Sequence, residues 1–220
     1  MTASPSVHRF QVPRTARLAI LGTPAVASVW WIVLHGYGQL AADFVAPFES
    51  VATTDRCVIA PEALSRFYVD RMNEHEQVGA SWMTREDRSY EIDDYIVYLD
   101  GVIRELTAAG NAPSVAVLGF SQGAATASRW ALLGDTDVDR LVLWGGAPAH
   151  DLDLAEHADH LRRLNLTLVS GTNDPYVSEN ERRAVQRRLD DHDVPATYHT
   201  FDGGHRIDRD TLGEIVAERP

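Results

Sequence analysis

The sequence predicts an α/β protein with a mostly parallel central sheet, an antiparallel N-terminal hairpin and helices on both faces of the sheet. Short runs rich in Val, Ile and Leu alternate along the chain with segments compatible with helices, as in βαβ units. These runs are continuously hydrophobic, as expected for parallel strands covered on both faces. The length of 220 residues suits one α/β domain, and we expect a single domain over residues 1–220.

The elements can be placed in chain order. Residues 8–12 and 16–21 are β-like segments separated by "PRT", which predicts an antiparallel hairpin at a sheet edge. Central strands are expected at residues 29–36, 56–61, 114–121, 140–146 and 166–174, and helices at residues 41–53, 91–110, 122–134 and 178–193. In the helix over residues 91–110, hydrophobic residues recur every three or four positions, which predicts one stripe packed on the sheet.

Residues 62–90 have no clean hydrophobic period and are too long for an ordinary connection. Phe67, Tyr68, Trp82 and Met83 lie in this segment, and such side chains gain stability by burial. We therefore expect a folded excursion loop near the functional site.

Composition excludes several classes of function. The net charge of -12 repels phosphate backbones, so we expect no nucleic-acid partner. The N-terminus has no secretory h-region and the longest hydrophobic run, residues 29–34, is too short to span a bilayer. We expect a cytoplasmic protein without integral membrane association, as a monomer or a homodimer. The single cysteine, Cys57, lies in a β-like run and is expected to be an inert core thiol.

The stretch "VAVLGFSQGAATASRW" predicts a nucleophile elbow at Ser121. A serine hydroxyl is a weak nucleophile that must be held next to a base and away from competing hydrogen bonds. A sharp strand-to-helix turn does this, and glycines two positions either side, Gly119 and Gly123, relieve the steric clashes of such a turn. A strand before the motif and a small-residue helix after it are the context that this chemistry requires.

A base and an orienting acid follow in the order typical of this elbow. Asp174 closes the strand run "LTLVSGTND", and His205 lies in "FDGGHRI". The imidazole would accept the Ser121 proton while Asp174 fixes its tautomer. Asp202 and His199 are the competing candidates, although His199 lies in an alternating run and is expected to be a strand residue.

An acyl-transfer site also needs N–H donors for an oxyanion. We expect the backbone amides of Gln122, at the start of a helix, and Tyr37, in the "HGYG" segment. His35 is expected to brace this segment without taking part in the chemistry. Trp82 and Met83 are hypothesised to line a substrate pocket, the alternative being a small core under the excursion loop.

The segments "LHGYG", "PEALSRFY", "GASWMTRE", "GFSQGAA", "SGTNDPYV" and "DGGHRI" together resemble the phospholipase/carboxylesterase branch of the α/β-hydrolases, the acyl-protein thioesterase-like serine esterases. The resemblance covers nearly the whole chain and implies an α/β-hydrolase fold. It also implies that Ser121, Asp174 and His205 form the triad and that Tyr37 and Gln122 are the oxyanion donors. Two positions depart from the family pattern, because Ala124 replaces a frequent glycine and Tyr37 a usual leucine.

The expected function is therefore a serine carboxylesterase that hydrolyses short- to medium-chain carboxylic esters or thioesters through an acyl-enzyme. The partner is a small-molecule ester, and no metal or cofactor is expected. Two alternatives remain open: a slow-turnover small-molecule receptor on the same fold, and an amidase or peptidase.

Overall fold

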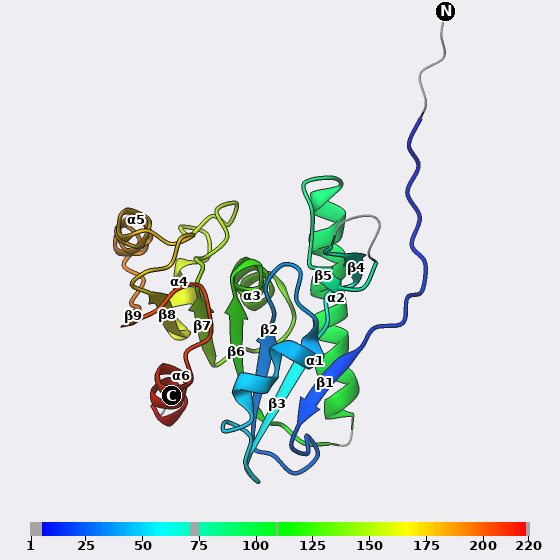
Figure 1. Ribbon diagram of the computed structural model, residues 1–220, viewed down its shortest axis with the longest axis horizontal. Helices are drawn as coiled ribbons and strands as arrows, with labels where there is room; N and C mark the ends of the chain where they lie inside the picture. The colour runs from blue at the N-terminus through cyan, green and yellow to red at the C-terminus, as the bar shows by residue number, and fades with distance from the viewer. Residues whose placement is uncertain (1–5, 71–74, 109, 219–220) are drawn as a thin grey trace, which may run out of the picture.

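The computed structural model describes residues 6–70, 75–108 and 110–218 of the chain. Within these residues, a seven-stranded sheet has the order β1-β3-β2-β6-β7-β8-β9 and forms the centre of the molecule (Figure 1). Its strands are β1 (Leu18–Leu21), β2 (Val29–Leu34), β3 (Arg56–Pro61), β6 (Ser114–Phe120), β7 (Arg140–Trp144), β8 (Asn165–Gly171) and β9 (Thr197–Phe201). Strands β3, β2, β6, β7, β8 and β9 are parallel, so their carboxyl ends meet at one edge of the sheet. This confirms the predicted fold class.

The N-terminal hairpin is the part of the predicted sheet that differs. Strand β1 is antiparallel at the sheet edge, as expected, but its partner is β3, with Leu18 opposite Pro61. Residues 8–12 form no strand and are exposed. The Arg9 guanidinium pairs with Asp87 and lies 4.9 Å from the centroid of the Tyr90 ring. These contacts hold the segment beside the start of α2 instead of at the sheet edge.

Helices cover both faces of the sheet and enclose two hydrophobic cores. One face carries α2 (Arg88–Thr107), α3 (Gln122–Leu133), α4 (Ala158–Arg163) and α5 (Glu179–Asp190). The opposite face carries α1 (Ala41–Phe44), the 3-10 turn η1 (Ala46–Phe48) and α6 (Arg209–Ala217). The hydrophobic stripe predicted for α2 is on its inner face, where Tyr95 and Leu99 are buried. No described helix is long and apolar enough to cross a membrane.

The excursion at residues 62–90 contains a small antiparallel hairpin of β4 (Ser65–Tyr68) and β5 (Val78–Ser81). The Gly38 N–H donates to the Ala80 carbonyl over 2.9 Å, so β5 lies against the loop that follows β2. Gly79 permits this approach, because a Cβ there would lie 2.3 Å from the Gly38 carbonyl oxygen. The excursion is thus folded against the edge of the sheet where the parallel strands end.

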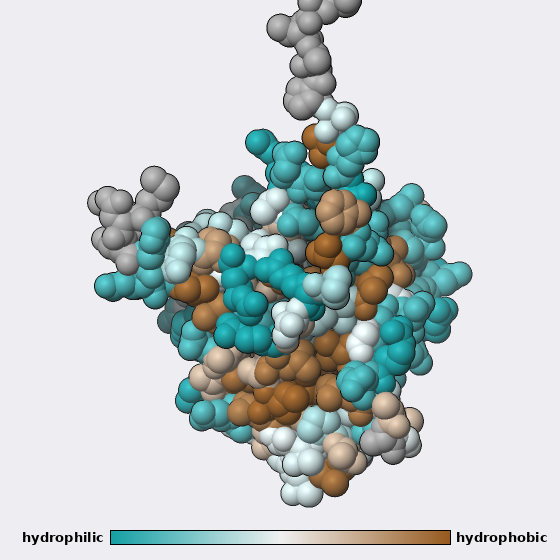
Figure 2. Space-filling view, turned by 90° about the vertical axis from the view of Figure 1, so that its right-hand side faces the viewer, coloured by the Kyte–Doolittle hydropathy of each residue, from teal (hydrophilic) through white to brown (hydrophobic). Residues whose placement is uncertain are grey.

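Hydrophobic side chains gather on the face of the molecule that carries β1 and α2 (Figure 2). The exposed hydrophobic residues of these two elements include Leu18, Ile20 and Val97. This face lies at the β1 edge of the sheet, whereas Ser121 follows the central strand β6.

Candidate active site

Ser121 lies in a strained turn between β6 and α3. Its backbone has φ 56° and ψ -116°, a conformation that costs a non-glycine residue about 1–3 kcal/mol. A Cβ on Gly119 would lie 2.1 Å from the Gly123 carbonyl oxygen, and a Cβ on Gly123 would lie 2.2 Å from that of Leu34. Glycine is therefore required at both positions for the helix to leave the strand so sharply. The geometry is that of a nucleophile elbow.

Asp174 and His205 form a hydrogen-bonded pair beyond the end of β8. The His205 Nδ1–H donates to Asp174 Oδ2 over 2.7 Å, and the Tyr176 N–H donates to Asp174 Oδ1 over 2.8 Å. The Asp174 side chain is 1% exposed and that of His205 is 15% exposed. Each carboxylate oxygen of Asp174 thus has one hydrogen-bond donor. Because Nδ1 carries the proton of the neutral His205 ring, its Nε2 is the acceptor.

His205 lies next to the elbow. Its ring centroid is 4.7 Å from that of Phe120, the residue before Ser121. A Cβ on Gly145, at the end of β7, would lie 2.9 Å from His205 Cε1. Among the residues that the structure describes, the Ser121 hydroxyl and the His205 ring form no direct hydrogen bond. Hydrogen bonds between nucleophile and base often tighten only when substrate binds.

Two backbone N–H groups flank Ser121. A Cβ on Gly36 would lie 3.2 Å from Ser121 Cβ, which places the loop after β2 against the serine. The Gly36 N–H donates to Gln39 Oε1 over 2.8 Å and holds this loop in place. In the described part of the chain, the N–H groups of Tyr37 and Gln122 donate to no protein acceptor. Both are available to a ligand oxygen, and Gln122 lies at the positive end of α3.

His35 is fully buried and both of its ring nitrogens are engaged. Its Nδ1–H donates to the Gly36 carbonyl over 2.7 Å, and its Nε2 accepts from the Ala63 N–H over 3.0 Å. Burial lowers the pKa of His35, because a charged imidazolium would be desolvated and would lose the Ala63 N–H bond. The geometry matches the expected bracing role.

The excursion loop meets the elbow through Gln122. The Trp82 N–H donates to Gln122 Oε1 over 3.0 Å, and Gln122 Nε2 donates to the Met83 carbonyl over 2.8 Å. The Trp82 side chain is 3% exposed and belongs to the core beside His35 and Tyr95. This position corresponds to the small-core alternative, and substrate contact by Trp82 and Met83 stays a prediction. The side-chain role of Gln122 was missed, since no local pattern signals a pairing between residues 40 positions apart.

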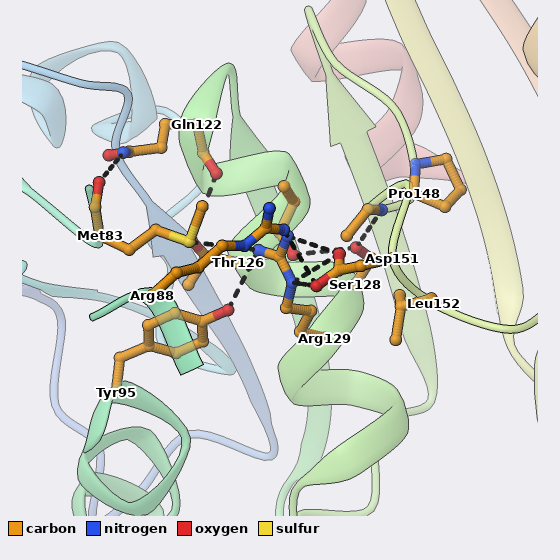
Figure 3. A network of polar contacts seen from close by, with 12 residues as sticks. Met83, Arg88, Tyr95, Gln122, Thr126, Ser128, Arg129, Pro148, Asp151 and Leu152 are labelled. Carbon is orange, nitrogen blue, oxygen red and sulfur yellow. Dashed lines mark hydrogen bonds and ion pairs between the residues drawn. The ribbon is translucent and has the colours of Figure 1, made fainter. Parts of the chain in front are cut away.

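A polar network supports α3 behind the elbow (Figure 3). The Arg129 side chain, 2% exposed, donates from Nε and Nη2 to Asp151 and from Nη1 to the Tyr95 hydroxyl. Arg88, from the first turn of α2, also pairs with Asp151 over 2.9 Å. Burial alone would raise the pKa of Asp151, but the hydrogen bonds and charge of Arg129 outweigh it and lower the pKa. The network joins α2, α3 and the loop after β7.

The profile of the phospholipase/carboxylesterase family matches residues 23–217. The chain belongs to this family. Membership indicates a hydrolase of the esterase or thioesterase type. A search of curated proteins finds no match.

Solved structures share the fold at low sequence identity. Acyl-protein thioesterase 2 from Zea mays has a TM-score of 0.68 and 16% identity, over 92% of this chain and 96% of that one. Esterase PE8 has a TM-score of 0.67 and 22% identity, over 93% and 97%. A Bacillus cereus carboxylesterase has a TM-score of 0.65 and 15% identity, over 91% and 92%. These likenesses support the α/β-hydrolase fold.

The structure also places the competing candidates. His199 lies in β9, as expected for a strand residue. Asp202 is exposed and accepts a hydrogen bond from Asn173 Nδ2 over 3.1 Å. The carboxylate that contacts His205 is therefore that of Asp174.

Proposed function

We propose that this protein is a serine carboxylesterase that hydrolyses short- to medium-chain carboxylic esters or thioesters through an acyl-enzyme on Ser121. The observation that carries the proposal is the Asp174–His205 pair lying beside a serine in a strained strand-to-helix turn. Family membership supports the esterase-type chemistry. The order of nucleophile, acid and base along the chain is that of α/β-hydrolases.

In the proposed mechanism, His205 Nε2 takes the Ser121 proton as Oγ bonds to the substrate carbonyl carbon. The carbonyl electron pair moves onto oxygen, and the N–H groups of Tyr37 and Gln122 stabilise that charge. The intermediate collapses, the bond to the leaving oxygen or sulfur breaks, and His205 donates its proton to the leaving group. Water then repeats the sequence on the acyl-enzyme, releasing the carboxylic acid and restoring Ser121.

Asp174 orients this cycle. Its carboxylate accepts the Nδ1–H of His205 and so keeps the Nε2 lone pair available. When His205 takes the proton, the buried carboxylate stabilises the imidazolium over the 2.7 Å hydrogen bond.

The test is covalent labelling with a fluorophosphonate, with the adduct located by mass spectrometry, beside turnover of p-nitrophenyl esters from acetate to octanoate. We expect an adduct on Ser121 that is lost in His205→Ala, and turnover of the esters. Labelling with negligible turnover would favour the slow-turnover receptor. Turnover of p-nitroanilides at a rate comparable to the esters would favour the amidase or peptidase, and no adduct on the folded protein would refute the nucleophile.

A further inference from the structure

The Ser81 hydroxyl is buried where the excursion meets the nucleophile elbow. Ser81 is the last residue of β5 and is 2% exposed. Its hydroxyl donates to the Met83 carbonyl over 2.8 Å and accepts from Gln122 Nε2 over 3.1 Å. Because the hydroxyl acts both as a donor and as an acceptor in a buried place, its orientation is fixed by its two partners.

Ser81 completes the hydrogen bonds of the Gln122 carboxamide. One Nε2 hydrogen of Gln122 goes to the Met83 carbonyl over 2.8 Å, and the other goes to Ser81 Oγ. The Gln122 Oε1 accepts from the Trp82 N–H over 3.0 Å. Gln122 directly follows Ser121, and its backbone N–H is one of the two proposed oxyanion donors. These hydrogen bonds therefore hold the first residue of α3 against the excursion.

The two residues that flank this serine in the chain bind the loop of the other proposed donor. The Ala80 carbonyl accepts from the Gly38 N–H over 2.9 Å. The Trp82 indole N–H donates to the His35 carbonyl over 2.9 Å. Tyr37 lies between His35 and Gly38, so the loop is bound to the excursion on both sides of the Tyr37 N–H. One short segment of the excursion thus contacts the loops of both proposed donors.

We propose that Ser81 is a positioning residue, which acts through the Gln122 carboxamide to set the distance between the N–H groups of Tyr37 and Gln122. This inference rests on the proposed esterase function and adds a residue that does not touch the substrate. The oxyanion forms only as Ser121 Oγ bonds to the carbonyl carbon, so a displaced donor lowers kcat and leaves KM nearly unchanged. Loss of a whole donor lowers kcat about 10²- to 10³-fold, and displacement of a donor should cost less.

Two variants and one matched control test this role. Ser81→Ala removes the hydroxyl and leaves one Nε2 hydrogen of Gln122 without its acceptor. Gln122→Met keeps the backbone N–H and the approximate length of the side chain but cannot form the carboxamide hydrogen bonds. Ser128→Ala is the control, since Ser128 is fully buried in α3 and its hydroxyl has the same kinds of partner. That hydroxyl donates to the Ala125 carbonyl and accepts from the Ala149 N–H, both over 3.0 Å, and neither partner belongs to the excursion.

The first measurement is the turnover of p-nitrophenyl butyrate. We expect kcat to fall roughly tenfold in Ser81→Ala and roughly 10- to 100-fold in Gln122→Met, with KM changed by less than about threefold. Ser128→Ala should keep kcat within a factor of about two, although it removes the same group from a buried site. An unchanged kcat in Ser81→Ala, an equal fall in Ser128→Ala, or a rise in KM without a fall in kcat would overturn the proposal.

The second measurement is hydrogen exchange of the backbone amides of residues 36–39, followed by mass spectrometry, which does not depend on turnover. Exchange should be faster than in the unaltered protein in Ser81→Ala and Gln122→Met and unchanged in Ser128→Ala, because only the first two loosen the excursion from the elbow. Faster exchange in a protein that the fluorophosphonate does not label would contradict the esterase but not the hold on the loop. Unchanged exchange and kcat in a protein that is labelled at Ser121 would contradict the positioning role but not the esterase.

Discussion

Replacement of Asp174 by asparagine should abolish most activity while leaving the fold nearly as stable. The two carboxylate oxygens each accept one hydrogen bond, Oδ2 from His205 Nδ1 over 2.7 Å and Oδ1 from the Tyr176 N–H over 2.8 Å. Asparagine offers one oxygen and one NH₂, so one of these two donors must face another donor.

The energies decide which arrangement forms. Turning the asparagine NH₂ toward the Tyr176 N–H would place two hydrogen-bond donors against each other. The side chain at position 174 is 1% exposed, so neither donor could turn to water, at a cost of about 1–3 kcal/mol. Turning it toward His205 costs less, because the neutral ring can move its proton to Nε2 and accept at Nδ1. The second arrangement preserves stability but leaves His205 without a lone pair for the Ser121 proton. We expect kcat to fall about 10³- to 10⁴-fold and the free energy of unfolding to change by less than about 1 kcal/mol.

The assay is p-nitrophenyl butyrate turnover together with urea denaturation. Asp202→Asn is the matched control, since Asp202 is exposed, lies three residues before His205 and does not contact it. That variant should keep kcat within a factor of about two, because surface substitutions change little. If Asp174→Asn retained a tenth or more of the activity, or if Asp202→Asn lost as much, the assigned roles would be wrong.

Four further outcomes are expected. Gly123→Ala should lower kcat and destabilise the fold by about 1–3 kcal/mol, measured by urea denaturation, because its Cβ would lie 2.2 Å from a β2 carbonyl oxygen. Burial lowers the pKa of His35 below 6.5, so on acidification the His35 imidazole is protonated in the unfolded chain before it is protonated in the folded protein. The free energy of unfolding should therefore fall as the pH drops through 6.5, and the part of this fall that comes from His35 should be missing in His35→Gln. Cys57 is buried and burial raises its thiol pKa to about 11, so Ellman's reagent at pH 8 should react only after unfolding. Asp151→Ala should cost about 1–3 kcal/mol in thermal or urea denaturation, since it removes the half-exposed carboxylate that accepts hydrogen bonds from two nitrogens of the buried Arg129 guanidinium.

Each outcome has its own control. Gly101→Ala adds a Cβ with no atom within 4 Å and should not destabilise the protein. A wild-type stability profile that is flat from pH 7.5 to 5.5 would contradict the assignment to His35. Rapid Cys57 modification in the native state would contradict its burial. Asp153→Ala removes an exposed carboxylate that caps only local N–H groups, and a loss equal to that of Asp151→Ala would contradict the network argument.

The sequence was sufficient to predict the elements whose physics is local. The continuous hydrophobic runs predicted the parallel strands because residues covered on both faces must all be apolar. The sharp turn at Ser121 was predictable because it requires glycine at the positions two residues before and two residues after the serine, and both glycines are visible in the sequence. The contact between Asp174 and His205 could be expected because both residues follow strand ends, and strand ends meet at one edge of a parallel sheet; the catalytic roles of the two residues stay predictions.

The features that sequence reasoning missed depend on pairings between distant segments. Residues 8–12 have strand-like composition, yet β3 takes β1 as its neighbour and Arg9 instead pairs with Asp87, 78 positions away. A pocket between α5 and the strands β8 and β9 combines residues from these two strands, one helix and two loops, and none of these segments carries a local sequence signature. An aromatic and a thioether in a long loop predicted that Trp82 and Met83 line a substrate pocket. The backbone of these two residues binds the Gln122 side chain, which no local pattern signals, and their contact with substrate stays a prediction.

The contacts of Gln122 explain how two separated N–H groups can be held for one oxyanion. Its backbone N–H is one proposed donor, and its carboxamide binds the peptide groups of Trp82 and Met83. The Trp82 indole N–H donates to the His35 carbonyl over 2.9 Å, two residues before the other proposed donor, Tyr37. The elbow and the loop after β2 are therefore tied through one segment of the excursion. Because an oxyanion hole acts by donors that are already in place, these hydrogen bonds provide a physical reason for a long excursion folded beside the site.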